Sequence, residues 1–503
     1  MATLSPPAQR SDEAQPAGPQ QQPVRRQTGL WLWPALLALP LMMYKINTPV
    51  LGTDELATWE VARRSTGQIL VTLQHVDAVH GTYYLFMHAW MEVFGDSPTA
   101  LRAPSALAMT VAAAVVALTG RRLFGAPAGL CGGLVFALIP AVSRFGQETR
   151  GYALVMLATA LATLLLLRAL EKPRSWWRWG AYALCLTCAG LLHLISLSIV
   201  LAHTVAVVVH AWRERRALWS FGLAAVVGTA CVSPVIVLGL SHDGRQLFWV
   251  EEPDGWSLLR IPQEVFASGV CAGALIALAV LAVPVRKERR DALVLCIAVA
   301  VLPLLTIWAA SHGEVSYFRY QYALFTLPAW SVLAGAGLAA TTRSWGATAA
   351  AVTVLGLLVV PDQTRMREQY EHDVPHRVDY PAAARTIAKY HRPGDTVVYG
   401  RGQSWMIGTG IHYYLPRDLT LRQALVARTA VEVNDLFAVD CPQPTTCLGA
   451  DKRRIWVVAE DGNADPLRAL PFGQAMALRA KYTAFGAERH TGVTVELLVR
   501  KPR

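Results

Sequence analysis

Charged residues are scarce in this chain. They make up 16% of its 503 residues, whereas 53% are hydrophobic, and the mean hydropathy is +0.33. This composition excludes disorder for the chain as a whole and argues against an ordinary soluble enzyme. We also expect no cleavable signal peptide, because Arg25 and Arg26 precede an apolar run that is long enough to be a spanning helix.

A basic stripe with interleaved aromatic residues is also missing, although the formal net charge is +11. The arginines are instead scattered between apolar runs, which argues against a nucleic-acid partner. In a membrane protein, an excess of positive charge usually lies in cytoplasmic loops.

Long apolar runs are what the sequence does contain. They can cross a hydrocarbon core of ~30 Å as helices. We predict eleven spans, at about 30–49, 99–119, 126–143, 151–169, 177–193, 195–212, 219–240, 265–285, 291–311, 320–340 and 344–361. The separation of 177–193 from 195–212 has little turn chemistry to support it, and the loss of one span would reverse every later loop.

The basic residues between the spans indicate an orientation. If Arg25 and Arg26 are cytoplasmic and the sides alternate, every dense basic cluster between spans falls on the cytoplasmic face. These clusters are Arg121–Arg122; Lys172, Arg174 and Arg178; Arg213, Arg215 and Arg216; Arg286, Lys287, Arg289 and Arg290; and Arg343. The pattern predicts a multi-pass α-helical protein of the plasma membrane with a cytoplasmic N-terminus.

The domain organisation follows from changes in composition. Residues 1–28 are predicted to form a disordered cytoplasmic tail, 29–361 a transmembrane domain with an outer loop at 50–98, and 362–503 an extracytoplasmic α/β domain. In the last domain we expect a helix at 380–390, a turn at 393–395, and strands at 396–399, 455–459 and 493–499. Cys441 and Cys447 either form a disulfide in an oxidising exterior or are two free thiols.

Asp54 and Glu55 follow the first span directly. A solvated turn or a cap for a helix at 56–64 would explain this acidic pair without any function. The pair lies at the membrane surface, however, where a reaction of a lipid headgroup must take place. The same loop also carries side chains that could supply a base, a metal site or sugar hydrogen bonds: His75, Asp77, His80, Tyr83, Tyr84 and His88.

Arginines gather at two further outer segments. Arg144 and Arg150 flank Glu148, which predicts either an internal ion pair or a site for a phosphate group, and both can hold together. Arg319 lies between Phe318 and Tyr320, which fits a lipid phosphate and interfacial anchoring equally well.

Several motifs, taken in order, resemble the GT-C glycosyltransferases, in the branch of protein O-mannosyltransferases and aminoarabinose transferases. They lie between about residues 30 and 340: Gly52-Thr53-Asp54-Glu55; Asp77-Ala-Val-His80-Gly-Thr-Tyr83-Tyr84-Leu85; Leu101-Arg102-Ala-Pro104-Ser105; Gln147-Glu148-Thr-Arg150-Gly-Tyr152; and Arg319-Tyr320 before Pro328. Members of this family often have two prolines where this chain has Gly81-Thr82.

The resemblance implies a GT-C fold and the transfer of a sugar, for which we expect mannose, from a polyprenyl-phosphate donor with inversion. The expected acceptor is an extracytoplasmic lipid, glycan or protein. Asp54, assisted by Glu55, is the expected base, and Arg144, Arg150 and Arg319 are expected to bind the donor phosphate. The expected substrate-binding residues are Asp77, His80, Tyr83, Gln147, Glu148, Tyr152 and Tyr320.

Several alternatives stay open. A divalent cation at Asp54, Glu55, Asp77 and His80 is compatible with the residue types, but no spacing defines the site. A pentosyltransferase of the same fold and a flippase or transporter for a lipid-linked sugar are the rival functions. A flippase would have charged or broken segments near the middle of several spans, whereas polar groups here collect at one face. A receptor or scaffold would leave these outer groups unexplained.

Overall fold

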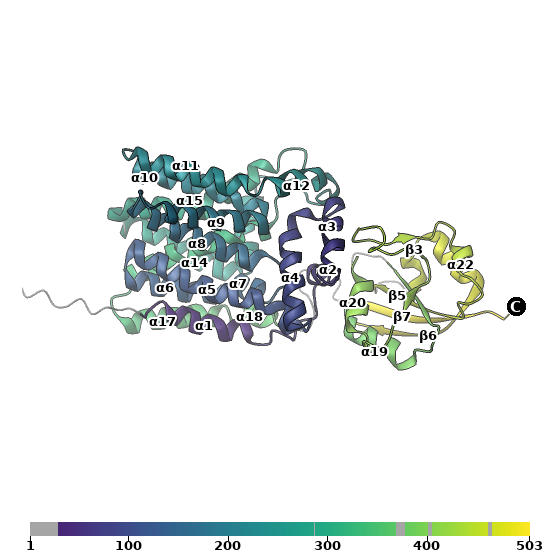
Figure 1. The fold of residues 1–503 in the computed structure, drawn as a ribbon. Coiled ribbons are helices and arrows are strands. Elements are labelled where there is room, and N and C mark those ends of the chain that lie inside the picture. Colours follow the sequence, from purple (N-terminus) through teal and green to yellow (C-terminus); the bar gives the residue numbers. More distant parts are fainter. Residues whose placement is uncertain (1–28, 286, 369–377, 401–404, 461–464, 503) are drawn as a thin grey trace, which may run out of the picture.

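The computed structural model contains a large helical bundle followed by a smaller domain built on a mixed β-sheet (Figure 1). It describes residues 29–285, 287–368, 378–400, 405–460 and 465–502, so the predicted tail at 1–28 lies outside the described part. The main helices of the bundle are α1 (Leu32–Met43), α5 (Pro98–Phe124), α6 (Ala126–Leu138), α7 (Pro140–Gly146), α8 (Tyr152–Glu171), α9 (Trp176–Leu192), α10 (Ile199–Ala211), α11 (Arg215–Ala230), α12 (Ser233–Gln246), α13 (Ser257–Phe266), α14 (Gly269–Val285), α15 (Arg290–Ala310), α16 (Leu327–Thr341), α17 (Trp345–Leu358) and α18 (Val360–Arg365).

Helices lie at all the predicted spans, and the chain is a multi-pass membrane protein. By length and composition, five described helices can each cross a membrane, or up to eight if each of three bent pairs is one span. The bends are 62° between α6 and α7, 50° between α11 and α12, and 104° between α13 and α14. The helices α1 and α17 are shorter and apolar, and α9 occupies the remaining predicted position.

Short 3-10 helices interrupt or extend the bundle. They are η2 (Leu194–Ser198), η3 (Lys287–Arg289) and η4 (Tyr320–Thr326). The backbone of His193 is extended (φ −164°, ψ 111°) between α9 and η2. A separate helix therefore begins after residue 193, at the predicted boundary with the least turn chemistry.

One end of the bundle is held by ion pairs between helix termini. Glu171 at the end of α8 pairs with Arg122 at the end of α5 and, at 3.9 Å, with Arg178 in α9. His210 at the end of α10 lies 2.9 Å from Asp291 at the start of α15. All these residues lie in or next to the basic clusters that were predicted to share one face. The packing of the helix ends therefore agrees with loops that alternate between the two faces of the bundle.

The outer loop at 50–98 folds into a layer of helices. These are α2 (Thr53–Ala62), α3 (Thr66–His75), η1 (Ala78–His80) and α4 (Gly81–Phe94), and the three α-helices lie between the bundle and the C-terminal domain (Figure 1). The predicted helix at 56–64 is confirmed as α2, whereas α3 was not predicted. A Cβ on Gly81 would lie 2.6 Å from Leu73, so the small residue lets α4 pack against α3.

The C-terminal domain is a five-stranded sheet in the order β2-β1-β5-β7-β6. The strand β1 is parallel to β2 and β5, whereas β7 is antiparallel to β5 and β6. The predicted helix and three strands are confirmed as α19, β1, β5 and β7. The elements are α19 (Tyr380–Tyr390), β1 (Thr396–Tyr399), α20 (Ile407–Tyr414), β2 (Arg422–Gln423), β3 (Val426–Arg428), β4 (Val439–Asp440), α21 (Pro444–Cys447), β5 (Arg454–Glu460), η5 (Pro466–Ala469), α22 (Phe472–Lys481), β6 (Tyr482–His490) and β7 (Val493–Arg500).

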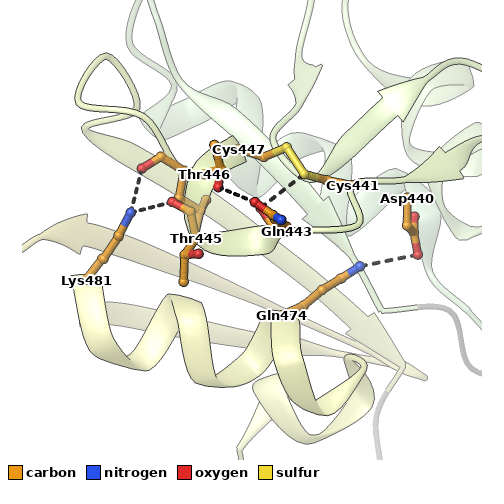
Figure 2. Close-up of a disulfide and its surroundings, with 9 residues drawn as sticks. Asp440, Cys441, Gln443, Thr445, Thr446, Cys447, Gln474 and Lys481 are labelled. Carbon is orange, nitrogen blue, oxygen red and sulfur yellow. Dashed lines mark hydrogen bonds between the residues drawn. A yellow bond between two sulfur atoms is a disulfide. The ribbon is translucent and has the colours of Figure 1, made fainter.

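Cys441 and Cys447 form a disulfide, with their Cα atoms 6.5 Å apart (Figure 2). Next to it, the Lys481 ammonium donates hydrogen bonds to the carbonyl oxygens of Thr445 and Leu448, at 2.6 and 3.1 Å. Of the two alternatives for these cysteines, the structure therefore has the disulfide, which ties α21 to the end of β4.

The C-terminal domain contacts the outer loop through α20. The Trp59 ring of α2 packs edge-on against the Tyr413 ring, with centroids 5.1 Å apart. The Tyr413 hydroxyl donates to the Asp96 carbonyl at 2.7 Å, and the Tyr414 hydroxyl accepts from the Leu51 N–H at 3.0 Å. The helix α2, whose first turn carries Asp54 and Glu55, is thus packed against the C-terminal domain.

Candidate active site

Glu55 is a buried structural carboxylate. Its side chain is about 5% exposed and pairs with Arg102 of α5, whose Nε donates to Oε1 at 2.8 Å and Nη2 to Oε2 at 2.6 Å. Thr149 donates its N–H and hydroxyl to Oε1, each at 3.0 Å, and the Gly52 N–H donates to Oε2 at 3.0 Å. Burial alone would raise the pKa of Glu55, but Arg102 and these donors lower it.

The side chain of Asp54 points toward Arg150 and not toward Arg102. Its side chain is 47% exposed, and Oδ1 accepts a hydrogen bond from Nη2 of Arg150 at 3.0 Å. Desolvation would raise the pKa of Asp54, but the charge and hydrogen bond of Arg150 outweigh it, with smaller contributions from His80 and Arg319. The result is a lowered pKa and an ionised, half-exposed carboxylate at the N-terminus of α2, where the helix dipole favours negative charge.

Arg150 is held from its other side by a polar chain. Its Nη1 donates to the Tyr84 hydroxyl at 3.2 Å, and that hydroxyl donates to Oδ2 of Asp77. The second oxygen of Asp77 lies 3.9 Å from Nε2 of His80. Asp77 has left-handed backbone angles (φ +59°, ψ 30°), which are uncommon outside glycine and often occur at functional sites.

A small pocket opens beside Asp54 and Glu55. Arg144 and Glu148 line it, with Arg144 Nε 3.9 Å from a Glu148 oxygen, so the predicted internal ion pair is formed. Gln147 also lines the pocket, and its amide donates to the carbonyl oxygens of Met42 and Tyr44 at 2.7 and 2.9 Å. These contacts join the pocket wall to the end of α1.

Four ring residues from four segments meet near Asp54 and Arg150. We call His80, Tyr152, His193 and Tyr322 the ring cluster. The His193 ring centroid lies 4.5 Å from that of Tyr322, 5.8 Å from that of Tyr152 and 6.3 Å from that of His80. Beyond the cluster, the Arg319 guanidinium lies over the Trp249 ring at 4.8 Å and over the Tyr320 ring at 5.9 Å.

The predicted site residues therefore separate into groups. On one side of Asp54 lie four of them: Arg150, Asp77, His80 and Tyr152. On the other side, the pocket next to Asp54 is lined by Arg144, Gln147 and Glu148. Arg319 and Tyr320 form a separate corner lined by aromatic rings. Two expectations need correction. Glu55 lines the pocket, but its carboxylate oxygens are engaged by Arg102 and other donors, and Tyr83 is buried with Leu56 and Met87, so in this arrangement neither side chain is free for a substrate.

The possible cation site is not formed. Among the residues that the structure describes, no three His, Cys, Asp or Glu side chains come together in a group that could hold a metal ion. Asp54, Glu55, Asp77 and His80 are all described, and Glu55 is committed to Arg102.

Tyr84 is predicted only as one of several polar side chains of the outer loop, and His193 and Tyr322 are not predicted at the site. Tyr84 belongs to the same loop motif as Tyr83 but lies on the face of α4 that meets Asp77. His193 carried one usable signal, since it is a polar residue at a break between two apolar runs. Tyr322 had no local signal apart from its nearness to Arg319.

Solved structures with a similar fold agree with this architecture. ArnT from Cupriavidus metallidurans in the apo state matches with a TM-score of 0.62 at 14% identity, over 95% of this chain and 99% of that chain. The same protein bound to undecaprenyl phosphate matches with a TM-score of 0.62 at 15% identity, over 95% and 100%. The oligosaccharyltransferase of Archaeoglobus fulgidus matches more weakly, with a TM-score of 0.48 at 10% identity, over 93% and 72%.

The fold is that of a GT-C membrane glycosyltransferase. Within this class, residues 82–238 match the family described as "Dolichyl-phosphate-mannose-protein mannosyltransferase". The predicted resemblance to the branch of mannosyltransferases and aminoarabinose transferases is thereby confirmed. No curated protein sequence matches the chain significantly.

Proposed function

We propose that this protein transfers mannose from a polyprenyl-phosphate donor to an extracytoplasmic acceptor, with inversion at the sugar carbon. Two comparisons support the donor class: the family match over residues 82–238 and the fold shared with a protein that binds undecaprenyl phosphate. The family description is what favours mannose over a pentose.

The observation that carries the proposal is the state of Asp54. It is an ionised, half-exposed carboxylate at the edge of a pocket, next to an arginine that a phosphate can also bind. In the proposed reaction Asp54 takes the proton of the acceptor hydroxyl, whose oxygen attacks the sugar carbon. The polyprenyl phosphate leaves with the electron pair of the broken bond and needs little acid assistance.

The contacts of Glu55 favour inversion. A double displacement with retention needs a second carboxylate or an equivalent nucleophile at the sugar carbon. Glu55 is the nearest candidate in sequence, but both of its oxygens accept bonds from Arg102 and backbone or hydroxyl donors. A single displacement uses Asp54 alone.

Arg150 links donor binding to the activation of Asp54. An arginine fork binds a phosphate with charge-assisted bonds, and Arg144 and Arg319 are further cations for the same group. When the donor phosphate engages Arg150, Asp54 loses its main stabilising partner and its pKa rises, which makes it a better base. In this proposal, Asp54 becomes a stronger base when the donor phosphate replaces it as the partner of Arg150.

The proposed orientation places this site outside the cytoplasm. The basic loops support it through the charge bias of membrane proteins, and the Cys441–Cys447 disulfide supports it because disulfides persist in oxidising compartments. The acceptor would then be an extracytoplasmic lipid, glycan or protein.

The test uses purified full-length protein in lipid with polyprenyl-phosphate mannose and measures release of polyprenyl phosphate. We expect wild-type turnover and a fall of about 10²–10⁴-fold in Asp54→Asn, the range for loss of a general base. Full activity in Asp54→Asn would refute the base assignment. Movement of intact donor across the bilayer without release of polyprenyl phosphate would favour a flippase.

A further inference from the structure

The segment that joins α1 to α2 shapes the site in two ways. Its residues Pro49, Val50 and Gly52 line the pocket, and the chain that follows directly carries Asp54 in the first turn of α2. Val50, Leu51 and Gly52 belong to no helix or strand, so no regular ladder of hydrogen bonds fixes their backbone. Buried backbone groups outside such ladders need other partners. The groups that hold this segment therefore help to set the position of Asp54.

Side chains on two sides of the segment supply these partners. Arg102 of α5 donates at 2.7, 2.9 and 3.3 Å to three carbonyl oxygens, those of Ile46, Pro49 and Val50. From the other side, the hydroxyl of Tyr414 in α20 accepts a hydrogen bond from the N–H of Leu51 at 3.0 Å. Leu51 is only 1% exposed, so water does not readily replace this acceptor. The bundle thus holds carbonyl groups of the segment, and the C-terminal domain holds an amide.

The helix α20, which carries Tyr414, is itself packed against α2 (Figure 1). The Tyr413 ring meets the rings of Tyr414 and Trp59 edge-on, with centroids 4.8 and 5.1 Å apart. Leu51 and Trp59 also share one apolar core with Ile411 of α20. A shift of α20 would therefore displace the start of α2 as well.

Tyr414 does not reach the reacting groups itself. The described residues that line the pocket include none from α20. Burial raises the pKa of Tyr414 to about 12, so its hydroxyl stays protonated at neutral pH. Its influence on the site therefore passes through the backbone between Leu51 and Asp54.

We propose that Tyr414 is a positioning residue for Asp54, and that the C-terminal domain contributes to the transfer reaction through it. The inference rests on the proposed role of Asp54 as the base. A general base must lie within hydrogen-bond reach of the proton that it takes, so a small displacement of the first turn of α2 lowers turnover. The Tyr414 hydroxyl restrains that turn by holding the amide of Leu51, three residues before Asp54.

Hydrogen exchange tests the contact without any turnover. Full-length wild type and Tyr414→Phe, both in lipid, are compared in peptides that cover residues 46–58. We expect the Leu51 amide to exchange about fivefold to tenfold faster in Tyr414→Phe, as for one lost hydrogen bond. Tyr390→Phe, which removes the hydroxyl of an exposed tyrosine of the same domain, is the matched control. Equal exchange in the two variants would overturn the positioning role.

Kinetics then connect the contact to Asp54. The assay is release of polyprenyl phosphate from polyprenyl-phosphate mannose, well below the melting temperature of each variant. We expect Tyr414→Phe to lower kcat at least about fivefold and to leave KM for the donor within about twofold, because the arginines proposed to bind the phosphate are unchanged. In the double variant with Asp54→Asn, Tyr414→Phe should cause no further loss, since it acts through Asp54.

The two measurements separate this inference from the proposed function. An active wild type with an unchanged kcat in Tyr414→Phe, or losses that multiply in the double variant, would overturn the inference alone. A wild type that releases no polyprenyl phosphate would refute the proposed function and with it the contribution to transfer. The exchange result would still show whether Tyr414 holds the Leu51 amide.

Discussion

Asp54 and Glu55 are neighbours in sequence, but successive side chains of a helix point about 100° apart, and this separates their roles. Glu55 points inward to Arg102 of α5, whereas Asp54 points to Arg150 and the open pocket. The two uses that the sequence allows for the acidic pair, a helix cap and a reactive carboxylate, are therefore divided between its two members.

Glu55→Gln should destabilise the protein. The variant leaves the Arg102 guanidinium buried without its countercharge, which costs about 3–5 kcal/mol in comparable buried pairs. We expect a clearly lower melting temperature in detergent and a smaller decrease for Asp54→Asn, because the Asp54 carboxylate is 47% exposed although its partner Arg150 is buried. If Glu55→Gln melts like the wild type and only turnover falls, Glu55 has a direct role in the reaction.

Arg150→Met should shift the pH dependence of kcat/KM. Arg150 lowers the pKa of Asp54 in the free enzyme, so the acidic limb of the wild type lies below the ordinary aspartate value. Without Arg150, desolvation dominates and the pKa of Asp54 rises. The acidic limb should then move to higher pH, in addition to a fall in the plateau from weaker phosphate binding.

The measurement is a profile of kcat/KM from about pH 4 to 9, with Arg417→Met as the control because it removes an exposed arginine on the C-terminal domain. A lower plateau without a shift of the acidic limb would mean that Asp54 is not the titrating base.

At the scale of elements, glycines allow helices of the bundle to touch at the backbone. A Cβ on Gly337 of α16 would collide with the Leu278 carbonyl of α14, and one on Gly335 would collide with Gly132 of α6. Close approach through small residues is typical of membrane helices, where packing rather than the hydrophobic effect holds them together.

Gly337→Ala should therefore destabilise the bundle by about 1–3 kcal/mol or more, since the obstacle is backbone and cannot rotate away. Gly180→Ala is the matched control, because a Cβ there meets nothing within 4 Å and alanine favours the helix. Thermal melts in the same detergent compare the two. Equal stability of both variants would show that α14 can move away from α16 at little cost.

The sequence predicted those elements whose signals are local. Apolar runs and period-2 or helical patterns located the spans, the helix at 380–390 and the strands of the C-terminal sheet. The helix α3 was missed because its apolar positions are mixed with polar ones in a short segment. The pairing of Arg102 with Glu55 was also missed, since it joins residues far apart in the chain and no local pattern encodes a partner.

The candidate site was predictable in the same uneven way. Asp54 and Arg150 stood out because charge at the end of a span is costly and needs a reason. His193 and Tyr322 did not, because an isolated ring in an apolar stretch usually packs in the core. The break after α9 brings His193 close to Asp54, and the turn of η4 brings Tyr322 there. Both features depend on packing between segments that are distant in the sequence.

At the scale of the whole molecule, the two ends of the bundle have different chemistry. One end carries ion pairs between helix termini, such as Arg178 with Glu171, among further basic residues of the loops. The other carries Asp54, the ring cluster and the layer of α2, α3 and α4 beneath the C-terminal domain (Figure 1). A lipid donor with its phosphate at the membrane surface meets the reactive groups only at the second end.

This polarity predicts which loops face the exterior. Glu314→Cys, at an exposed position between α15 and η4, should react with a membrane-impermeant maleimide in intact cells. Arg343→Cys, exposed between α16 and α17, should react only after permeabilisation, because basic loops are retained in the cytoplasm. The wild-type chain corrects for labelling of the native free cysteines, and Cys441 and Cys447 are protected by their disulfide. The reverse labelling pattern would put Asp54 on the cytoplasmic side, and an extracytoplasmic acceptor would then be ruled out.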